Sequence, residues 1–388
     1  MFKALMKQRF LVLGVALSLM GGLAGCQAGF VAEPAAIEIT PLATAVVVEE
    51  PAVMVEAEPV VESAAVGLIF NVYDREPMMG MVDGTAEGYK VVSDKPLGLL
   101  SPSGQKLLYR DDMGQFYVFN LVTGEDKRLE TDKLVGTTNA HQWIDDNQVL
   151  IGVWLSEDEQ GPNTGHLAIY DLVTDVRLII TTELTGSLAT LSPDEKTIAY
   201  AGEFPYLYDM ETEITTQFDP TVFAGWDHSE DVRFGSPSWS PDGDQIVWIV
   251  GGTFDGKWQI GTAVFDLTNQ TARLLHPYEP VGRGGWPGPA EFSPDGRWMA
   301  VEEWPTDWTQ SGIWVYELYG DSSFHAAEKS SWPIWSLDGT ALFFNQVKED
   351  GVMGLTMFDI ARGEAQALDM VPNGAMPVGF AASYPQLP

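Results

Sequence analysis

The sequence predicts an all-β fold, a closed ring of four-stranded antiparallel sheets of the β-propeller type. The first observation is a turn motif, an aromatic residue or Leu followed by Ser-Pro-Asp-Gly or a variant of it. Its six copies begin at Leu100, Trp143, Leu191, Trp239, Phe292 and Trp335. Their spacings of 43, 48, 48, 53 and 43 residues match the length of a propeller blade and not that of a helical repeat.

The second observation is another motif, which follows each turn by 17 to 27 residues and reads aromatic, then Asp, Asn or Glu, then aliphatic. Its copies begin at Phe119, Tyr170, Tyr208, Phe265, Tyr316 and Phe358. Two motifs in fixed order, repeated six times, indicate a repeated structural unit. We expect the acidic residue to accept hydrogen bonds in a turn, and not to act as a catalytic acid.

One unit illustrates how the motifs form a blade. Residues 237–239 make a short strand, and the turn 240–243 supplies Pro for a fixed φ, Asp as an acceptor and Gly for a positive φ. Residues 245–250 are a continuous apolar strand, 260–267 a third strand, and 271–275 a fourth with alternating polarity. Four such strands make one propeller blade.

The aromatic residue at the start of the turn has a packing role. Because blades pack face to face, a large ring at this position is expected to fill the wedge between adjacent sheets. We therefore interpret Trp143, Trp239, Phe292 and Trp335 as structural residues.

The two ends of the repeat region predict the number of blades. Residues 68–71, 79–83 and 88–92 match the last three strands of a blade, and residues 375–381 match an isolated first strand. Joined, they make a seventh blade closed by both termini, which removes an exposed sheet edge. A six-bladed ring is the alternative, if residues 68–92 form an irregular cap.

The N-terminal region has the pattern of an export signal. Lys3, Lys7 and Arg9 precede a short apolar stretch, and Leu-Ala-Gly then leads to Cys26, the only cysteine. This ending resembles a bacterial lipobox, which implies cleavage after residue 25 and lipid attachment to Cys26. Residues 26–66 are rich in Ala, Val, Pro and Glu and predict a disordered tether.

The repeats resemble the TolB-like and WD-repeat-like propellers, on the Trp-Ser-Pro-Asp-Gly turns and the aromatic-Asp motif. The resemblance covers residues 67–388 and implies a TolB-like β-propeller lipoprotein. The turn at Trp143, which reads Trp-Ile-Asp-Asp-Asn, departs most because it lacks Pro and Gly. The chain also lacks the α/β domain that precedes the propeller in TolB, so the resemblance implies no specific Tol role.

Charge limits the classes of partner. The chain has 21 basic and 55 acidic residues and a formal net charge of −34. Removal of the signal takes away three basic residues, and the seven glutamates of the tether leave about −30 on the propeller. Such a field repels nucleic acid and anionic lipid headgroups. The charge favours a cationic partner or serves solubility.

No catalytic motif is present in the sequence. There is no Gly-x-Ser-x-Gly elbow, no phosphate loop and no complete EF-hand loop, and the five histidines are scattered. We therefore expect no enzyme activity, no cofactor and no metal site.

The loops predict a binding face. Two inter-blade loops, 219–235 and 276–289, are long, and the following blades add further aromatic residues on the same face. The predicted face comprises Trp226, Asp227, His228, Arg233, Tyr278, Arg283, Trp286, Trp304, Asp307, Trp308 and Trp332. Trp, Tyr and Arg are enriched at binding hot spots, although such rings can instead pack on each other to hold loops down.

These observations predict a lipid-anchored, extracytoplasmic propeller that binds a protein partner in the bacterial cell envelope. It would be held at a membrane by a diacylglyceryl-type lipid on Cys26, on the periplasmic side or the cell surface. Glycan or small-ligand binding on the aromatic face is the alternative, and a propeller enzyme with a site in the central channel is the least favoured.

Overall fold

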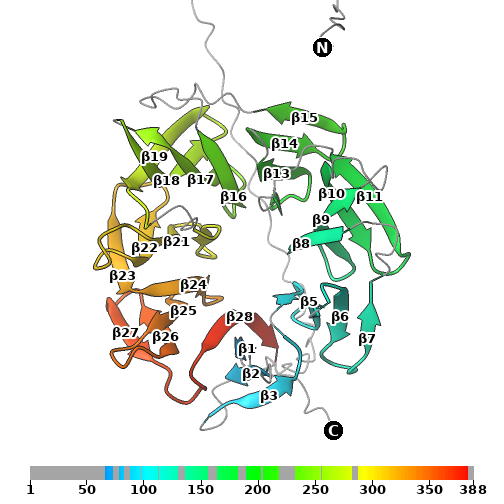
Figure 1. The fold of residues 1–388 in the computed structure, drawn as a ribbon, viewed down its shortest axis with the longest axis horizontal. Coiled ribbons are helices and arrows are strands. Elements are labelled where there is room, and N and C mark those ends of the chain that lie inside the picture. The colour runs from blue at the N-terminus through cyan, green and yellow to red at the C-terminus, as the bar shows by residue number, and fades with distance from the viewer. Residues whose placement is uncertain are drawn as a thin grey trace, which may run out of the picture. The chain divides into compact units, whose positions relative to one another are not determined.

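A computed structural model describes residues 66–72, 78–82, 88–96, 98–111, 113–129, 136–155, 164–181, 189–201, 204–217, 232–254, 256–281 and 287–382. These residues belong to the compact unit Val61–Pro388. Their strands form seven four-stranded antiparallel sheets arranged as blades around a ring (Figure 1). The predicted seven-bladed propeller is therefore confirmed over its six-bladed alternative.

The first four blades follow the chain from the innermost to the outermost strand. Blade 1 is β4 (Gly98–Leu100), β5 (Lys106–Arg110), β6 (Phe116–Asn120) and β7 (Asp126–Arg128). Blade 2 is β8 (Gly136–Trp143), β9 (Gln148–Leu155), β10 (Thr164–Asp171) and β11 (Val176–Thr181). Blade 3 is β12 (Ala189–Leu191), β13 (Thr197–Ala201), β14 (Pro205–Asp209) and β15 (Ile214–Gln217). Blade 4 is β16 (Arg233–Trp239), β17 (Gln245–Phe254), β18 (Lys257–Asp266) and β19 (Thr271–Tyr278).

The remaining blades complete the ring. Blade 5 is β20 (Glu291–Phe292), β21 (Trp298–Glu303), β22 (Gly312–Glu317) and β23 (Ser323–Glu328). Blade 6 is β24 (Ser330–Trp335), β25 (Ala341–Val347), β26 (Met353–Asp359) and β27 (Glu364–Ala367). Blade 7 is β28 (Ala375–Ala382), β1 (Val66–Val72), β2 (Met78–Val82) and β3 (Lys90–Ser93). No helix within the described residues has the length and apolar character needed to cross a membrane.

Blade 7 joins the two ends of the domain, as the sequence predicts. The last strand, β28, pairs antiparallel with the first, β1, with Leu68 opposite Phe380 and Val72 opposite Ala375. Buried Leu68 and Phe70 pack with Leu355 of blade 6, so the closing blade shares a core with its neighbour. This pairing covers the edge of β1 that would otherwise be open.

The core of the domain lies between blades. In the described residues each buried hydrophobic cluster joins strands of two adjacent sheets. Between blades 3 and 4, for example, Trp248 is fully buried and packs with Ala199 and Phe234. The continuous apolar second strands of the sequence thus correspond to sheets covered on both faces.

The turn motif folds through its own side chains. In four blades the Ser hydroxyl donates to the Asp carboxylate two residues later at 2.6–2.7 Å, in the pairs Ser192–Asp194, Ser240–Asp242, Ser293–Asp295 and Ser336–Asp338. The same hydroxyl then accepts a backbone N–H, as Ser240 does from Gln245 at 2.9 Å. Gly243 takes the positive φ of 76° that this turn requires.

The divergent turn of blade 2 is one residue shorter than the turn of blade 4, since Trp143 pairs with Val149 and Trp239 with Ile246. Asp145 accepts the backbone N–H groups of Asn147 and Gln148 at 2.6 and 2.7 Å. Asp146 accepts the N–H of Ser103 in blade 1 at 3.1 Å. Carboxylates therefore hold a turn that lacks Pro and Gly.

The second motif stabilises a turn, as predicted. Asp171 accepts the backbone N–H groups of Val173 and Thr174, both at 2.9 Å. These bonds, led by that of Thr174, lower the pKa of Asp171 to about 2. Asp209 accepts two N–H groups in the same way in blade 3.

The tryptophans of the turn motif connect blades, which confirms their structural role. The indole N–H donates to the backbone oxygen of the residue that precedes the motif in the blade before. The pairs are Trp143 to Leu99 at 2.9 Å, Trp239 to Thr190 at 3.4 Å and Trp335 to Glu291 at 2.9 Å. Each ring therefore fixes the angle between two neighbouring sheets while it fills their wedge.

Candidate binding face

The ring has two faces, which we name the turn face and the loop face. The turn face carries the six turn motifs. The loop face carries the connections between the second and third strands of each blade and the connections between blades. All described members of the predicted binding face come from the loop-face ends of blades 4 to 6.

Six of the predicted residues can be placed. Arg233 begins β16 and is exposed, Tyr278 ends β19, and Trp332 is the third residue of β24. Trp304, Asp307 and Trp308 lie between β21 and β22. Cys26, Trp226, Asp227, His228, Arg283 and Trp286 lie outside the described residues.

Trp332 is presented to solvent by a bulge in an inner strand. The register between β24 and β25 shifts between Ser331 and Ile334, and Trp332 has a positive φ of 59°. Its side chain is 55% exposed. A bulky residue in the left-handed region is strained, so the surroundings must hold it there. The carboxylate of Glu302 does so by accepting the Trp332 backbone N–H at 2.6 Å.

The same carboxylate also binds one of two neighbouring indoles of blade 5. Trp304 donates its indole N–H to the other oxygen of Glu302 at 3.4 Å. Its ring meets that of Trp308 edge to face, with centroids 6.4 Å apart, and Trp308 is 52% exposed. Burial raises the pKa of Glu302. Glu302 thus couples the inner strand of blade 6 to the loop of blade 5.

A second carboxylate, that of Glu303, fixes the end of β21 directly after Glu302. Glu303 is 2% exposed and accepts hydrogen bonds from the Tyr316 hydroxyl and, at 2.6 Å, from His276 Nδ1. This hydrogen bond raises the pKa of His276. Trp314 stacks on His325 and makes a tilted contact with His276, with ring centroids 4.8 and 4.9 Å away. The end of β21 is therefore held by neighbours on both sides.

The other predicted residues have different surroundings. Tyr278 is 7% exposed and packs in the core between blades 4 and 5, so it supports the face and offers little surface. Asp307 accepts the backbone N–H and the hydroxyl of Thr309, at 3.0 and 2.7 Å, which lowers its pKa and shapes the loop. The structure brings together Trp304, Trp308 and Trp332.

Sequence reasoning missed Glu302, which organises this group. A signal was present, because two adjacent glutamates end the otherwise apolar strand β21. In a chain this acidic, carboxylate pairs are frequent, so the pair did not stand out. Its importance depends on burial, which the sequence does not display.

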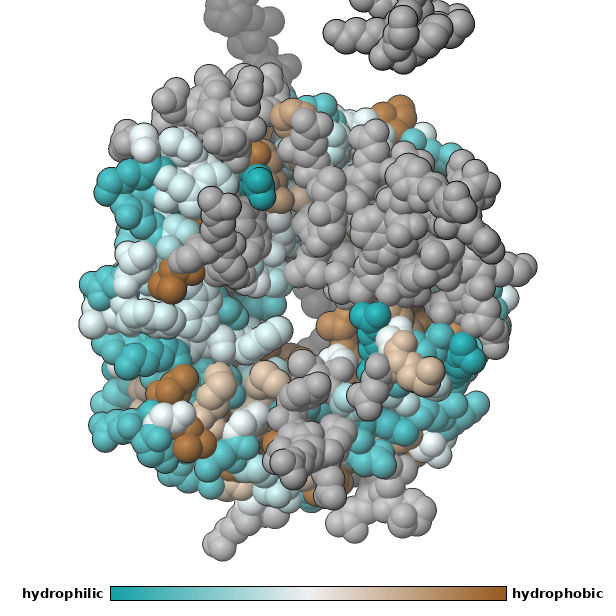
Figure 2. Space-filling model, viewed as in Figure 1, coloured by the Kyte–Doolittle hydropathy of each residue, from teal (hydrophilic) through white to brown (hydrophobic). Residues whose placement is uncertain are grey.

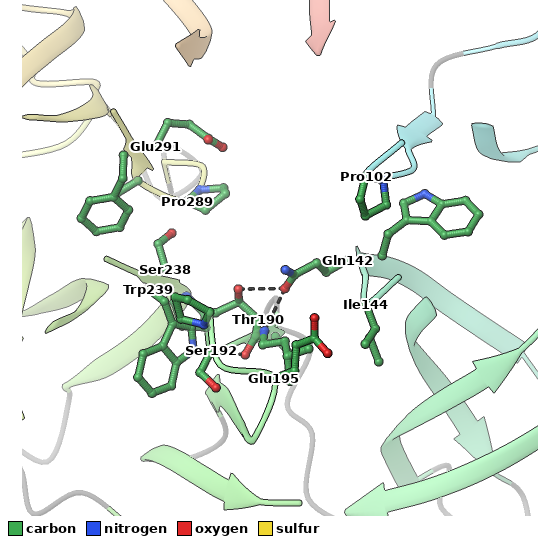
Figure 3. A pocket seen from close by; sticks show the side chains of 17 residues that line it. Pro102, Gln142, Ile144, Thr190, Ser192, Glu195, Ser238, Trp239, Pro289 and Glu291 are labelled. Carbon is green, nitrogen blue, oxygen red and sulfur yellow. Dashed lines mark hydrogen bonds between the residues drawn. The ribbon is translucent and has the colours of Figure 1, made fainter. Parts of the chain in front are cut away.

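The central channel contains a second candidate site. A cavity of about 610 Å³ is lined by the inner strands β8, β12, β16 and β20 near the turn face (Figure 3). The space-filling view shows an opening at the centre of the ring (Figure 2). Polar side chains converge in this cavity, among them Gln142, Thr190, Ser238 and Glu291. In the described part of the chain, no cluster of three His, Cys, Asp or Glu side chains could hold a metal ion.

The chain is an all-β, seven-bladed propeller protein with an aromatic loop face and a polar channel cavity. No protein-family model matches the sequence, and no curated protein matches it.

Solved structures are similar in fold. An oligogalacturonate lyase in complex with manganese has a TM-score of 0.57 at 16% identity, over 75% of this chain and 85% of the lyase. An oligogalacturonate lyase from Vibrio parahaemolyticus has a TM-score of 0.52 at 12% identity, over 78% and 95% of the two chains. TolB from Acinetobacter baumannii is more distant, with a TM-score of 0.43 at 15% identity over 81% and 82%. At such identities the likeness shows the propeller fold alone.

Proposed function

We propose that the protein is an exported, lipid-anchored propeller that binds a protein partner on its loop face. Trp308 and Trp332 act as the anchors of this interface. Glu302 holds the backbone of Trp332 and the indole of Trp304, against which Trp308 packs. The signal-like N-terminus and the tether after Cys26 motivate the location. The exposed indoles of blades 5 and 6 motivate the binding.

The observation that carries the proposal is the exposure of two tryptophans on a rigid frame. Trp308 and Trp332 are each more than half exposed, although the backbone of Trp332 is strained and hydrogen-bonded to a partly buried carboxylate. The bulge that carries Trp332 presents its ring to solvent on a backbone held by Glu302. A preorganised anchor also loses little conformational entropy on binding.

The charge of the chain indicates the chemistry of the partner. With a formal net charge of −34, the protein attracts a basic surface and repels an acidic one. Exposed Arg233 on blade 4 adds a local donor for a carboxylate of the partner. We therefore expect a partner with an apolar pocket for the indoles and a basic rim.

The test is capture of partners from envelope membranes of the producing cell, with Trp308→Ala and Trp332→Ala as the variants. Each change removes an anchor that contributes about 2 kcal/mol or more at a hot spot, so at least a tenfold loss of the captured partner is expected. Leu337→Ala is the matched control, because Leu337 is 62% exposed but lies in a turn motif on the opposite face. Equal capture by all three variants would contradict the proposed interface.

The location is tested separately. Changing Cys26 to Ser removes the acylation site, so the variant should leave the membrane fraction, while the original chain should partition into detergent. Retention of the variant in the membrane would reject lipid anchoring without affecting the proposed interface.

Glycan binding on the same face is the second candidate. An exposed indole such as Trp332 offers a flat apolar surface on which a sugar ring can stack. A glycan array then gives specific signals that Trp332→Ala abolishes, and an array without signal rejects this candidate.

A further inference from the structure

The channel cavity is formed by one repeated position of the fold. The residue directly before the turn motif is Gln142 in blade 2, Thr190 in blade 3, Ser238 in blade 4 and Glu291 in blade 5, and all four line the cavity. The same position holds Ile334 in blade 6, which packs against the core between blades 6 and 7. Polar groups therefore gather in one sector of the channel.

The amide of Gln142 has a fixed orientation. Its oxygen accepts the Thr190 hydroxyl at 2.9 Å and the Leu191 backbone N–H at 2.8 Å. A backbone N–H can only donate, so the oxygen must lie on this side. The NH2 group remains directed to the cavity as a donor (Figure 3), and within the described residues it makes no hydrogen bond.

Glu291 extends from the opposite wall with an unpaired carboxyl group. Figure 3 shows the Glu291 and Gln142 side chains projecting toward the space between them. The backbone oxygen of Glu291 accepts the Trp335 indole, but the described part of the chain supplies no hydrogen bond to its carboxyl oxygens. Burial, with a smaller effect of Glu302, raises the pKa of Glu291 to about 7.

The charged groups of the cavity have one sign. Among its described lining residues, Glu195 and Glu291 carry charge, and none is Lys, Arg or His. The Ser238 hydroxyl adds a group that can donate or accept a hydrogen bond. An anionic ligand would face two carboxylates without a compensating cation. A bare divalent cation needs several oxygen ligands at short range, and no such cluster occurs in the described residues.

We propose that this cavity binds a small organic ammonium compound, with its cationic nitrogen on Glu291 and an oxygen of the same molecule on the Gln142 amide. The ligand supplies the positive counter-charge that no described lining residue provides for the Glu291 carboxylate. A charge-assisted hydrogen bond of this kind is about twice as strong as a neutral one. The volume of about 610 Å³ is in the range of small-molecule sites. This site is independent of the loop face, because it lies at the turn-face end of the channel.

The binding is tested by titration calorimetry of the full chain at pH 8 with 4-amino-1-butanol, which carries one ammonium group and one hydroxyl oxygen. Its neutral match is 1,4-butanediol. The ammonium probe is expected to bind, and the diol to bind at least tenfold more weakly. No heat from the ammonium probe, or equal affinity for the two compounds, would overturn the proposal.

Variants assign the site. Glu291→Gln keeps the shape of the side chain and removes the charge, so ammonium affinity should fall at least tenfold. Asp244→Asn is the matched control, because Asp244 is an exposed carboxylate in the turn of the neighbouring blade 4 and does not line the cavity. The ammonium affinity of the Asp244→Asn variant should stay within twofold of that of the original chain. Unchanged binding by Glu291→Gln in a folded protein would place the ligand elsewhere and reject this site.

Discussion

Replacing Glu291 by Gln should stabilise the protein, and the gain should depend on pH. The carboxyl group of Glu291 has its pKa raised from an ordinary value of 4.5 to about 7, mainly by burial and secondarily by Glu302. In the unfolded chain the group ionises near its ordinary value. The folded state therefore binds the proton more tightly, and ionisation of this group opposes folding.

The magnitude follows from the shift. A difference of about 2.5 pKa units corresponds to at most roughly 3 kcal/mol, at about 1.4 kcal/mol per unit. Below pH 4.5 the group is protonated in both states, and Glu291→Gln should have nearly the stability of the original chain. Between pH 4.5 and 7 the free energy of unfolding of the original chain falls by this amount relative to that of the variant. Above pH 8 the difference between the two free energies stays constant.

Urea unfolding at pH 4, 6 and 8 measures the difference. The free energy of unfolding of the variant minus that of the original chain should rise from near zero to about 2–3 kcal/mol. The other carboxylates are present in both proteins, so the difference reports Glu291 together with its interaction with Glu302. A difference that does not change with pH, or one that favours the original chain at pH 8, would refute the reasoning.

Three further predictions concern the fold. Trp335→Phe leaves the backbone oxygen of Glu291 without its indole donor and should cost about 1–3 kcal/mol in the free energy of unfolding, measured in urea. His276→Phe should destabilise the protein by up to about 1 kcal/mol at pH 6, because protonated His276 pairs with Glu303. That difference should fade as the pH rises through the raised pKa of His276, and persistence at pH 9 would contradict it. Deletion of residues 375–388 removes the strand that closes blade 7, so sedimentation should show aggregates in place of a monomeric folded ring.

The two candidate sites differ in the side chains that they offer to a ligand. The loop face presents apolar rings, and the partly buried carboxylate of Glu302 holds the backbone of Trp332 and the indole of Trp304. The cavity presents a carboxylate, Glu291, that has no hydrogen-bond partner within the described part of the chain. Their tests are separable, since tryptophan variants leave the cavity intact and Glu291→Gln leaves the indoles in place.

The blade was predictable because its signals are local. The turn that begins at Trp239 closes through hydrogen bonds among residues within five positions of each other, so the sequence motif and the structure carry the same information. The predicted strands of this blade are correct in order, although β17 and β18 extend to Phe254 and start at Lys257, beyond the predicted ends. A regular hairpin lengthens cooperatively once its register is set, which the composition of its loop does not reveal.

The sequence by itself determined the all-β class and predicted closure by both ends, with seven blades favoured and six as the alternative. These follow from turn chemistry repeated at a fixed period and from leftover strands at the two termini. Only the tertiary structure brought Glu302 to the backbone of Trp332, thirty positions away in the next blade, and Gln142 and Glu291 to one cavity. Bulges in the inner strands change which side chains face the channel, and ring geometry sets which blades meet. Contacts of that kind depend on burial and distance across blades, for which no local pattern exists.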